Sequence, residues 1–233
     1  MPVSRRFIQV AGICFALSSL TTLGLIFLPR FSPEALDATS RARLILDTAY
    51  MARRWIALFH PLIVLTGAFG VLVVRFEAAA DLAITGFLYY VFWALTEGIQ
   101  QSLTLVALDW TWRRQFLAAG SDAERAVLQQ YMDGLNALSD GFFFFLLIAF
   151  IVANALYAAA VWGGSSLQRI VAVSFGVSSM LGVVSLLTSY GGTIMPPNVM
   201  AVAYPALGPA GRLLTGIWLL RASGPDIPLA RAL

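Results

Sequence analysis

The amino-acid sequence predicts an all-α membrane protein, a six-transmembrane-helix bundle with two amphipathic loop helices on one face. Two observations lead to this prediction. Of the 233 residues, 59% are hydrophobic and only 12% are charged, whereas a soluble domain carries about twice that charged fraction. Apolar runs of about 20 residues recur along the whole chain, and each is long enough to cross the ~30 Å hydrocarbon core of a bilayer. We therefore expect residues 1–233 to form a single transmembrane domain.

The apolar runs predict helices rather than barrel strands. Only helices and closed barrels satisfy every backbone polar group in lipid, and these runs lack the alternation of polar and apolar residues that a barrel strand shows. The expected spans are residues 7–28, 55–75, 82–108, 140–162, 169–190 and 199–220.

Two segments between the spans predict amphipathic helices. Before the second span, Ser32 is a candidate N-cap, with Pro33 at the first helical position. Before the fourth span, Ser121 and Glu124 predict a capping box, and apolar residues then recur at helical spacing. We expect these helices either to lie along the membrane interface, or to form a lid or a docking surface for a partner.

An even number of spans places both chain ends on the same side of the membrane. The short segments on that side carry Arg5, Arg6, Arg75, Arg169, Arg221 and Arg231. The other side carries eight arginines, but in two long loops that also hold eight acidic residues. Basic density in short segments favours the cytoplasm. We therefore expect a multi-pass protein of the bacterial inner (cytoplasmic) membrane with cytoplasmic N- and C-termini.

Scarce residue types exclude several cofactors. All 15 basic residues are arginine, and without lysine the chain cannot form a Schiff base with retinal or a substrate. Cys14 is the one cysteine and His60 the one histidine, which excludes an internal disulfide, a cysteine metal cluster and haem held by two histidines. The net charge of +3 is small and scattered, unlike the basic patch of a nucleic-acid-binding protein. The sequence predicts no cofactor, no metal site and no nucleic-acid partner.

Polar residues interrupt the third span, YYVFWALTEGIQQSLTLVALDW. At 1.5 Å per residue Glu97 lies near the membrane midplane, and Gln100 and Gln101 follow it by one turn. Tyr90, Glu97 and Gln101 share one helical face, and Trp93 and Gln100 flank that face. An ionisable residue at this depth is costly, so it predicts a functional site.

Other spans carry polar residues at similar depth. Asn154 lies in the central zone of the fourth span, as do serines of the first and fifth spans. His60, followed by Pro61, lies one to two turns inside the second span, where a hydrogen-bonded structural histidine is favoured over a proton relay. Asp109 lies at the end of the third span, where we expect water to reach it.

Arg212 in the sixth span is the second intramembrane charge. Helical side chains lean toward the N-terminus of their own helix, so Glu97 and Arg212 lean toward each other from antiparallel spans. An ion pair between them is possible if the third and sixth spans are neighbours. Pro205 and Pro209 predict a kink in the sixth span. A full break, which we favour less, would aim a half-helix N-terminus at an anion.

These residues form the candidate site. Glu97 is the candidate catalytic residue, and no metal ligand is predicted. The alternative is that the polar residues only hydrogen-bond between helices and fix their packing. The candidate ligand-binding residues are Gln100, Gln101, Tyr90, Trp93, Asn154, Arg212 and His60.

Three stretches of the chain carry a resemblance. They are AGICFALSSLTTLG in the first span, the long capped loop that follows it, and LSDGFFFFLLIAFIVANALYAAAVWGGSSLQRIVAVSFGVSSMLG, where a short loop joins the fourth and fifth spans. In these features the chain resembles an uncharacterised bacterial six-transmembrane-helix family, defined as a domain of unknown function. The resemblance implies the fold and the membrane location over nearly the whole chain, and it implies no activity.

Three functions remain open. We favour a non-enzymatic membrane protein that binds a lipophilic or small anionic ligand, or a partner membrane subunit, through the polar layer. The alternative is an intramembrane enzyme in which Glu97 acts as general acid on an isoprenoid-like substrate, as terpene cyclases do. A proton-coupled transporter is less favoured because the sequence shows no inverted repeat. Rhomboid-like serine proteases, HExxH metalloproteases and P-loop proteins are excluded by their missing motifs.

Overall fold

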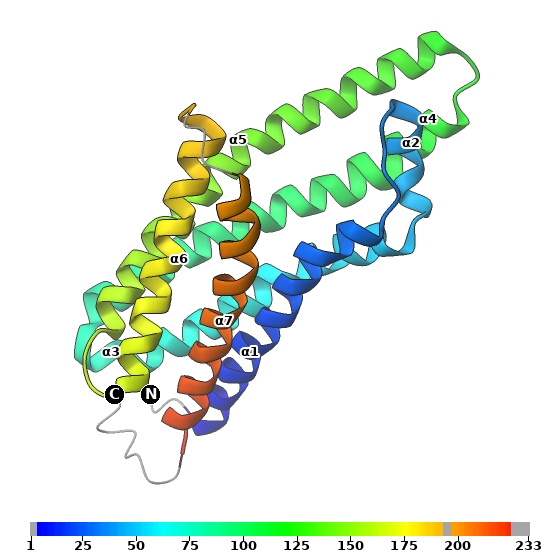
Figure 1. The fold of residues 1–233 in the computed structure, drawn as a ribbon. Helices are drawn as coiled ribbons and strands as arrows, with labels where there is room; N and C mark the ends of the chain where they lie inside the picture. Colours follow the sequence, from blue (N-terminus) through cyan, green and yellow to red (C-terminus); the bar gives the residue numbers. More distant parts are fainter. Residues whose placement is uncertain (1–3, 193–196, 225–233) are drawn as a thin grey trace.

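The computed structural model describes residues 4–192 and 197–224, and within them the chain is helical without strands (Figure 1). This confirms the predicted all-helical bundle. The helices are α1 (Arg5–Phe27), α2 (Ala38–Arg43), α3 (Thr48–Leu103), α4 (Arg113–Ala118), α5 (Asp122–Val161), α6 (Ser166–Tyr190) and α7 (Pro197–Ala222). Two 3₁₀ turns, η1 (Leu28–Phe31) and η2 (Leu44–Leu46), and one π-helix, η3 (Thr104–Trp112), complete the described elements.

Helix α3 is a hairpin of two antiparallel helices rather than one rod. Its backbone leaves the helical region at Ala79, where φ is −157° and ψ is 52°. The rings of Phe69 and Phe87 then lie 5.3 Å apart between centroids, whereas 18 residues of straight helix would separate them by about 27 Å. Residues 48–78 and 80–103 are the first and second halves of α3, and they contain the expected second span and most of the expected third span.

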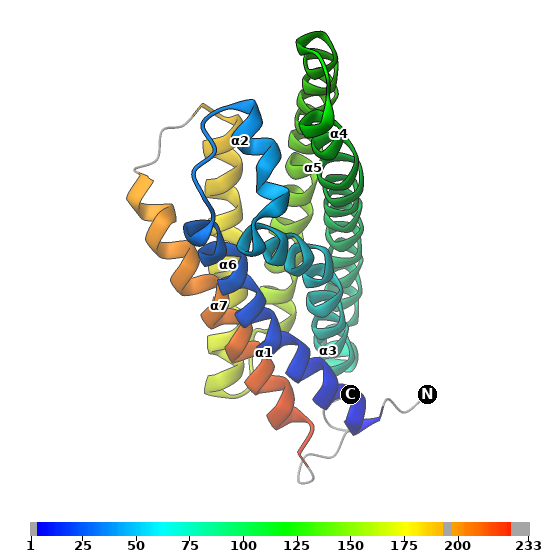
Figure 2. The ribbon, with the colours of Figure 1, turned by 90° about the vertical axis from the view of Figure 1, so that its right-hand side faces the viewer.

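The six long helical segments form a closed ring of antiparallel neighbours (Figures 1 and 2). Each segment packs on the next along the chain, and α7 returns to pack on α1. Contacts that mark these neighbours are Ala11 with Gly70, Phe69 with Phe87, Tyr90 with Asn154, Ile151 with Ser179, Ser174 with Gly211, and Gly12 with Gly216. The start of α1 and the end of α7 therefore lie at the same end of the bundle.

The interior of the ring is packed solid at the end where α1 starts and α7 ends. The Tyr157 hydroxyl donates a 2.8 Å hydrogen bond to the carbonyl oxygen of Ala68, and its ring meets Phe175 edge-on at 5.5 Å. The other buried side chains here are Ile8, Phe15, Val64, Val71, Val161, Val171 and Leu219. Buried side chains therefore fill the centre of the ring in this half of the bundle.

Four helical stretches of the described residues are long and apolar enough to cross a membrane. They are Arg5–Phe31, Thr48–Ala118, Asp122–Val161 and Ser166–Tyr190. The second stretch includes the α3 hairpin, and so it contains two of the six expected spans.

The predicted helix start at Ser32 and Pro33 is wrong. Residues 33–36 are not helical, and α2 begins only at Ala38. The Ser32 hydroxyl instead donates a 2.9 Å hydrogen bond to Asp47, which caps the start of α3. Asp37 caps α2, because it forms a reciprocal capping box with Ser40.

The second predicted loop helix is the beginning of α5. Its cap at Ser121 is confirmed, because the hydroxyl accepts a hydrogen bond from the Glu124 backbone, although the Glu124 carboxylate accepts from Gly120 instead of Ser121. The helix then continues unbroken into the expected fourth span. Its buried face packs on η3 and α4, through Leu128, Met132 and Leu135 against Leu108 and Phe116. The second loop helix is therefore not separate from the fourth span, and Figure 2 shows α4 and the start of α5 extending beyond the bundle.

Helices α1 and α7 approach each other so closely that a side chain does not fit between them. A Cβ atom on Gly216 would lie 2.7 Å from the Gly12 carbonyl oxygen and 2.8 Å from the Ala16 nitrogen. We expect Gly216→Val to lower stability by about 1–3 kcal/mol through overpacking. The control is Gly98→Val, because nothing lies within 4 Å of the Cβ position at Gly98. Equal melting temperatures of the two variants in detergent would contradict this packing.

Candidate functional site

A cavity of about 670 Å³ occupies the half of the ring away from the packed end. Both halves of α3 line it together with α1, α5, α6 and α7. Its apolar walls include Leu25, Ile26, Ala57, Trp93, Phe143, Leu146, Leu147, Phe150 and Leu181. Its polar lining is Thr22, Arg30, Arg53, Arg54, His60, Glu97, Gln100, Gln101, Ser185, Tyr204 and Arg212. Six of the eight residues predicted from sequence therefore line one cavity.

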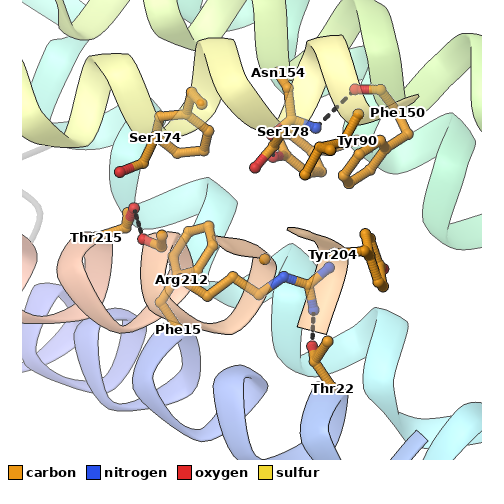
Figure 3. A pocket seen from close by; sticks show the side chains of 14 residues that line it. Phe15, Thr22, Tyr90, Phe150, Asn154, Ser174, Ser178, Tyr204, Arg212 and Thr215 are labelled. Carbon is orange, nitrogen blue, oxygen red and sulfur yellow. Dashed lines mark hydrogen bonds between the residues drawn. The ribbon is translucent and has the colours of Figure 1, made fainter. Parts of the chain in front are cut away.

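Arg212 lies at the deep end of the cavity. Its Nη1 donates to Thr22 Oγ1 at 2.7 Å and to His60 Nε2 at 2.5 Å. Figure 3 shows the guanidinium beside Tyr204, with its hydrogen bond to Thr22. Both bonds use Nη1, so Nε and Nη2 of Arg212 have no protein partner within the described residues.

Of the two alternatives for Glu97, an ion pair with Arg212 or a position facing a cavity, the structure has the second. No carboxylate of the described residues lies within 4 Å of the Arg212 guanidinium. The reason is that α1 and the first half of α3 supply a hydroxyl and an imidazole that hold the guanidinium instead. Glu97 and Arg212 nevertheless line the same cavity.

The hydrogen bonds around His60 determine its protonation. An arginine nitrogen only donates, so Nε2 of His60 must accept and carries no proton. The Thr21 hydroxyl donates to the Ser18 carbonyl oxygen, so it accepts from Nδ1 of His60 at 2.7 Å. His60 is therefore neutral with its proton on Nδ1, and only 3% of its surface is exposed. Its role here is to position Arg212.

Three arginines lie at the mouth of the cavity. Arg53 is seven residues from His60, about 10 Å along the helix. Its Nε donates to the Leu25 carbonyl oxygen at 3.2 Å. Arg30 lies over the Phe27 ring at 4.8 Å. Arg54 forms an ion pair, at 3.3 Å, with a carboxylate outside the cavity lining. The cavity thus has cationic groups at both ends and apolar walls between them.

The carboxylate that pairs with Arg54 belongs to Asp109. The prediction that water reaches Asp109 is wrong. Asp109 is fully buried. It accepts from Arg113 at 2.8 Å and from the Tyr50 hydroxyl at 3.0 Å. The hydroxyl of Tyr50 in turn accepts hydrogen bonds from both arginines. This network joins the start of α3 to the π-helix.

The π-helix η3 explains why Asp109 faces inward. The backbone N–H of Arg113 donates to the carbonyl oxygen of Leu108, five residues earlier, as π-helical winding requires. The wider turn rotates the residues that follow relative to an α-helix, and depth counted along an ideal α-helix does not include this rotation. Such π segments occur frequently at functional sites.

Glu97 lies between the two cationic ends. It follows Trp93 by one turn toward the mouth, about 6 Å, and the Trp93 ring meets the His60 ring edge-on at 6.2 Å. Glu97 is the one acidic side chain in the cavity lining, and it forms no ion pair with the described residues.

Tyr90 and Asn154 lie outside this cavity. They line a small adjoining pocket of about 20 Å³, on the side opposite Arg212 (Figure 3). The Tyr90 hydroxyl donates to Asn154 Oδ1 at 3.0 Å, and Asn154 donates to the Phe150 carbonyl oxygen at 2.7 Å. Both residues expose only 2% of their surface. Their polar groups satisfy each other between α3 and α5.

The two glutamines differ in their partners. Gln100 donates a 3.1 Å hydrogen bond to the Ser139 carbonyl oxygen and so ties α3 to α5. The Oε1 atom of Gln101 is buried and has no hydrogen-bond partner within the described chain. Gln101 is therefore the more available of the two for a ligand.

Helix α7 continues through Pro205 and Pro209 from Pro197 to Ala222. The break that would aim a half-helix N-terminus into the bundle is therefore not found in α7. Arg212 itself, and not a helix end, supplies the positive charge at the deep end.

Comparison with known proteins found no matching family model, no matching curated protein and no matching solved structure. The resemblance to a six-helix family stays a prediction. No group of three metal-ligating side chains occurs in the part of the chain that the structure describes.

Proposed function

We propose that this protein spans the bacterial inner membrane six times, with both termini in the cytoplasm. The closed ring of antiparallel segments and their apolar composition support this placement. The two halves of α3 supply two crossings and α7 supplies the sixth. In this orientation the cavity mouth, with Arg30, Arg53 and Arg54, faces the periplasm, and Arg212 lies near the midplane.

We propose further that the cavity binds an amphiphilic anion. The observation that carries this proposal is Arg212, a guanidinium held by Thr22 and His60 inside the cavity with no carboxylate partner among the described residues. Arg212 is half-buried. A charge withdrawn from water without a partner is unfavourable, and an anion supplies the missing partner. A cavity of 670 Å³ is in the range that holds small molecules.

The rest of the cavity suits the other parts of such a ligand. Leu146, Leu147 and Phe150 on α5 form an apolar wall along which an alkyl chain can lie. The arginines at the mouth attract anions toward the cavity and raise the association rate. At the mouth, Arg54 is already paired with Asp109, Arg53 already donates to the Leu25 carbonyl oxygen, and Arg30 is exposed. We therefore assign the anionic group to Arg212 rather than to the mouth.

The test compares 1-decanesulfonate with 1-decanol, which has the same chain and no charge. Binding is measured by calorimetry on the protein in lipid nanodiscs, with empty nanodiscs as control. A hydrogen bond to a charged group contributes about 1.5–3 kcal/mol, so we expect the sulfonate to bind about 10- to 100-fold more tightly. Equal affinities, or no binding of the sulfonate, would contradict the proposal.

A second candidate function is supported by the surroundings of Glu97. Its cavity also holds Trp93, Phe143 and Phe150, and aromatic faces stabilise a carbocation. A general acid there would protonate a carbon–carbon double bond of an isoprenoid, and loss of another proton would yield an isomer. Geranylgeraniol incubated with the wild-type protein in deuterated water would then incorporate deuterium. Geranylgeraniol incubated with the Glu97→Gln variant would not. No incorporation by the wild type excludes this activity on that substrate.

A further inference from the structure

The charges in the cavity lining are unbalanced. Glu97 is its one acidic side chain, while Arg30, Arg53 and Arg212 have no carboxylate within 4 Å among the described residues. Glu97 is therefore the one side chain of the lining whose charge can offset these cations. A bound anion would perform the same task.

The geometry brings the two negative charges close together. Glu97 lies one helical turn from the level of Trp93 and His60, about 6 Å along α3, and Arg212 contacts His60 at that level. An anion on Arg212 therefore lies within one to two turns of the Glu97 carboxylate. Like charges at this separation repel strongly where water is scarce.

We propose that the cavity binds its anion together with one proton, which Glu97 takes up from solvent. This inference rests on the proposed anion site. The anion replaces the carboxylate as counter-charge to Arg212, and the neutral carboxyl group removes the repulsion. Binding one monoanion together with one proton then leaves the net charge of the cavity unchanged.

The other charged or titratable groups that face this cavity come from three elements. The 3₁₀ turn η1 contributes Arg30, α3 contributes Arg53, Arg54 and His60, and α7 contributes Tyr204 and Arg212. The lining residues from α5 and α6 carry no titratable group. Arginine and tyrosine do not titrate near neutral pH, so His60 is the one competitor for the proton. Its Nε2 already accepts from Arg212, and a proton there would displace the guanidinium.

The test measures the affinity for 1-decanesulfonate, whose charge is constant, from about pH 5.5 to about 8.5. Uptake of one proton makes the affinity fall by up to about tenfold per pH unit as the pH rises. The Glu97→Gln variant should bind 1-decanesulfonate as tightly at every pH as the wild type does at acidic pH. His60→Gln, which keeps an acceptor for Arg212, should retain the pH dependence.

The outcomes separate this inference from the proposal on which it rests. A wild-type affinity that does not vary with pH overturns proton uptake and leaves the anion site standing. If the pH dependence persists in Glu97→Gln, or disappears only in His60→Gln, another group takes up the proton. Either result also overturns proton uptake by Glu97. Absence of sulfonate binding at every pH overturns the proposed function itself.

Discussion

Replacing Asp109 by alanine is expected to destabilise the protein by about 3–5 kcal/mol, because it leaves buried positive charge without its counter-charge. Arg54 and Arg113 both pair with this carboxylate, and Tyr50 donates to it. The same change frees the π-helix from the start of α3. Thermal unfolding in detergent, followed by circular dichroism, measures the effect.

The matched control is Asp122→Ala, because Asp122 also pairs with an arginine, Arg125, at 2.9 Å. Those two side chains are exposed by 98% and 44%, and exposed pairs contribute at most about 1 kcal/mol. We expect a small loss there and a large loss at Asp109. If the two variants have equal melting temperatures, the buried network does not hold the π-helix against the start of α3.

The second large effect is expected on ligand affinity. Arg212→Gln keeps a polar side chain that can bond to Thr22 or His60, and it removes the charge. Removing one partner of a buried, hydrogen-bonded charge pair costs about 2–5 kcal/mol, so the affinity for 1-decanesulfonate should fall about a hundredfold or more. The affinity for 1-decanol should change little.

Arg169→Gln provides the control for Arg212→Gln. Arg169 is an exposed residue in the first turn of α6, and it does not line the cavity. We expect wild-type affinity from this variant. A wild-type affinity in Arg212→Gln would show that the anion binds elsewhere.

The sequence predicts the fold to the extent that apolar length and composition determine it. The six expected spans fall on six helical segments, because burial in an apolar environment demands long apolar helices. The hairpin at Ala79 coincides with the polar stretch between the second and third spans. The start of α2 could not be predicted in the same way, since the Ser32 hydroxyl is used by Asp47, a residue 15 positions away.

Depth counting along ideal helices finds the deep part of the candidate site and misses its mouth. It singles out Glu97, His60 and Arg212 as polar residues inside three different spans, and all three line the cavity. It assigns Arg30 and Arg53 to loops in water, because hydropathy alone cannot show that the cavity extends to that end. The spacing of Arg53, seven residues before His60 on one helical face, was the available signal.

The partners of each charge depend on the order of helices around the ring. Arg212 meets α1 and the first half of α3, and side-chain direction alone favours Glu97 instead. The π-helix that buries Asp109 has no pattern in TLVALDWTW that distinguishes it from an α-helix. These features follow from tertiary packing, which periodicity does not describe.

Locating a bound amphiphile directly is the measurement that tests the central claim most directly. The protein is crystallised with 10-bromodecanesulfonate, and the anomalous signal of bromine marks the end of the chain. We predict the sulfonate at about 3 Å from the Arg212 guanidinium, and the bromine inside the cavity beside Leu146 and Leu147. Bromine found only on the outer surface of the bundle, with no density at Arg212, would contradict the account.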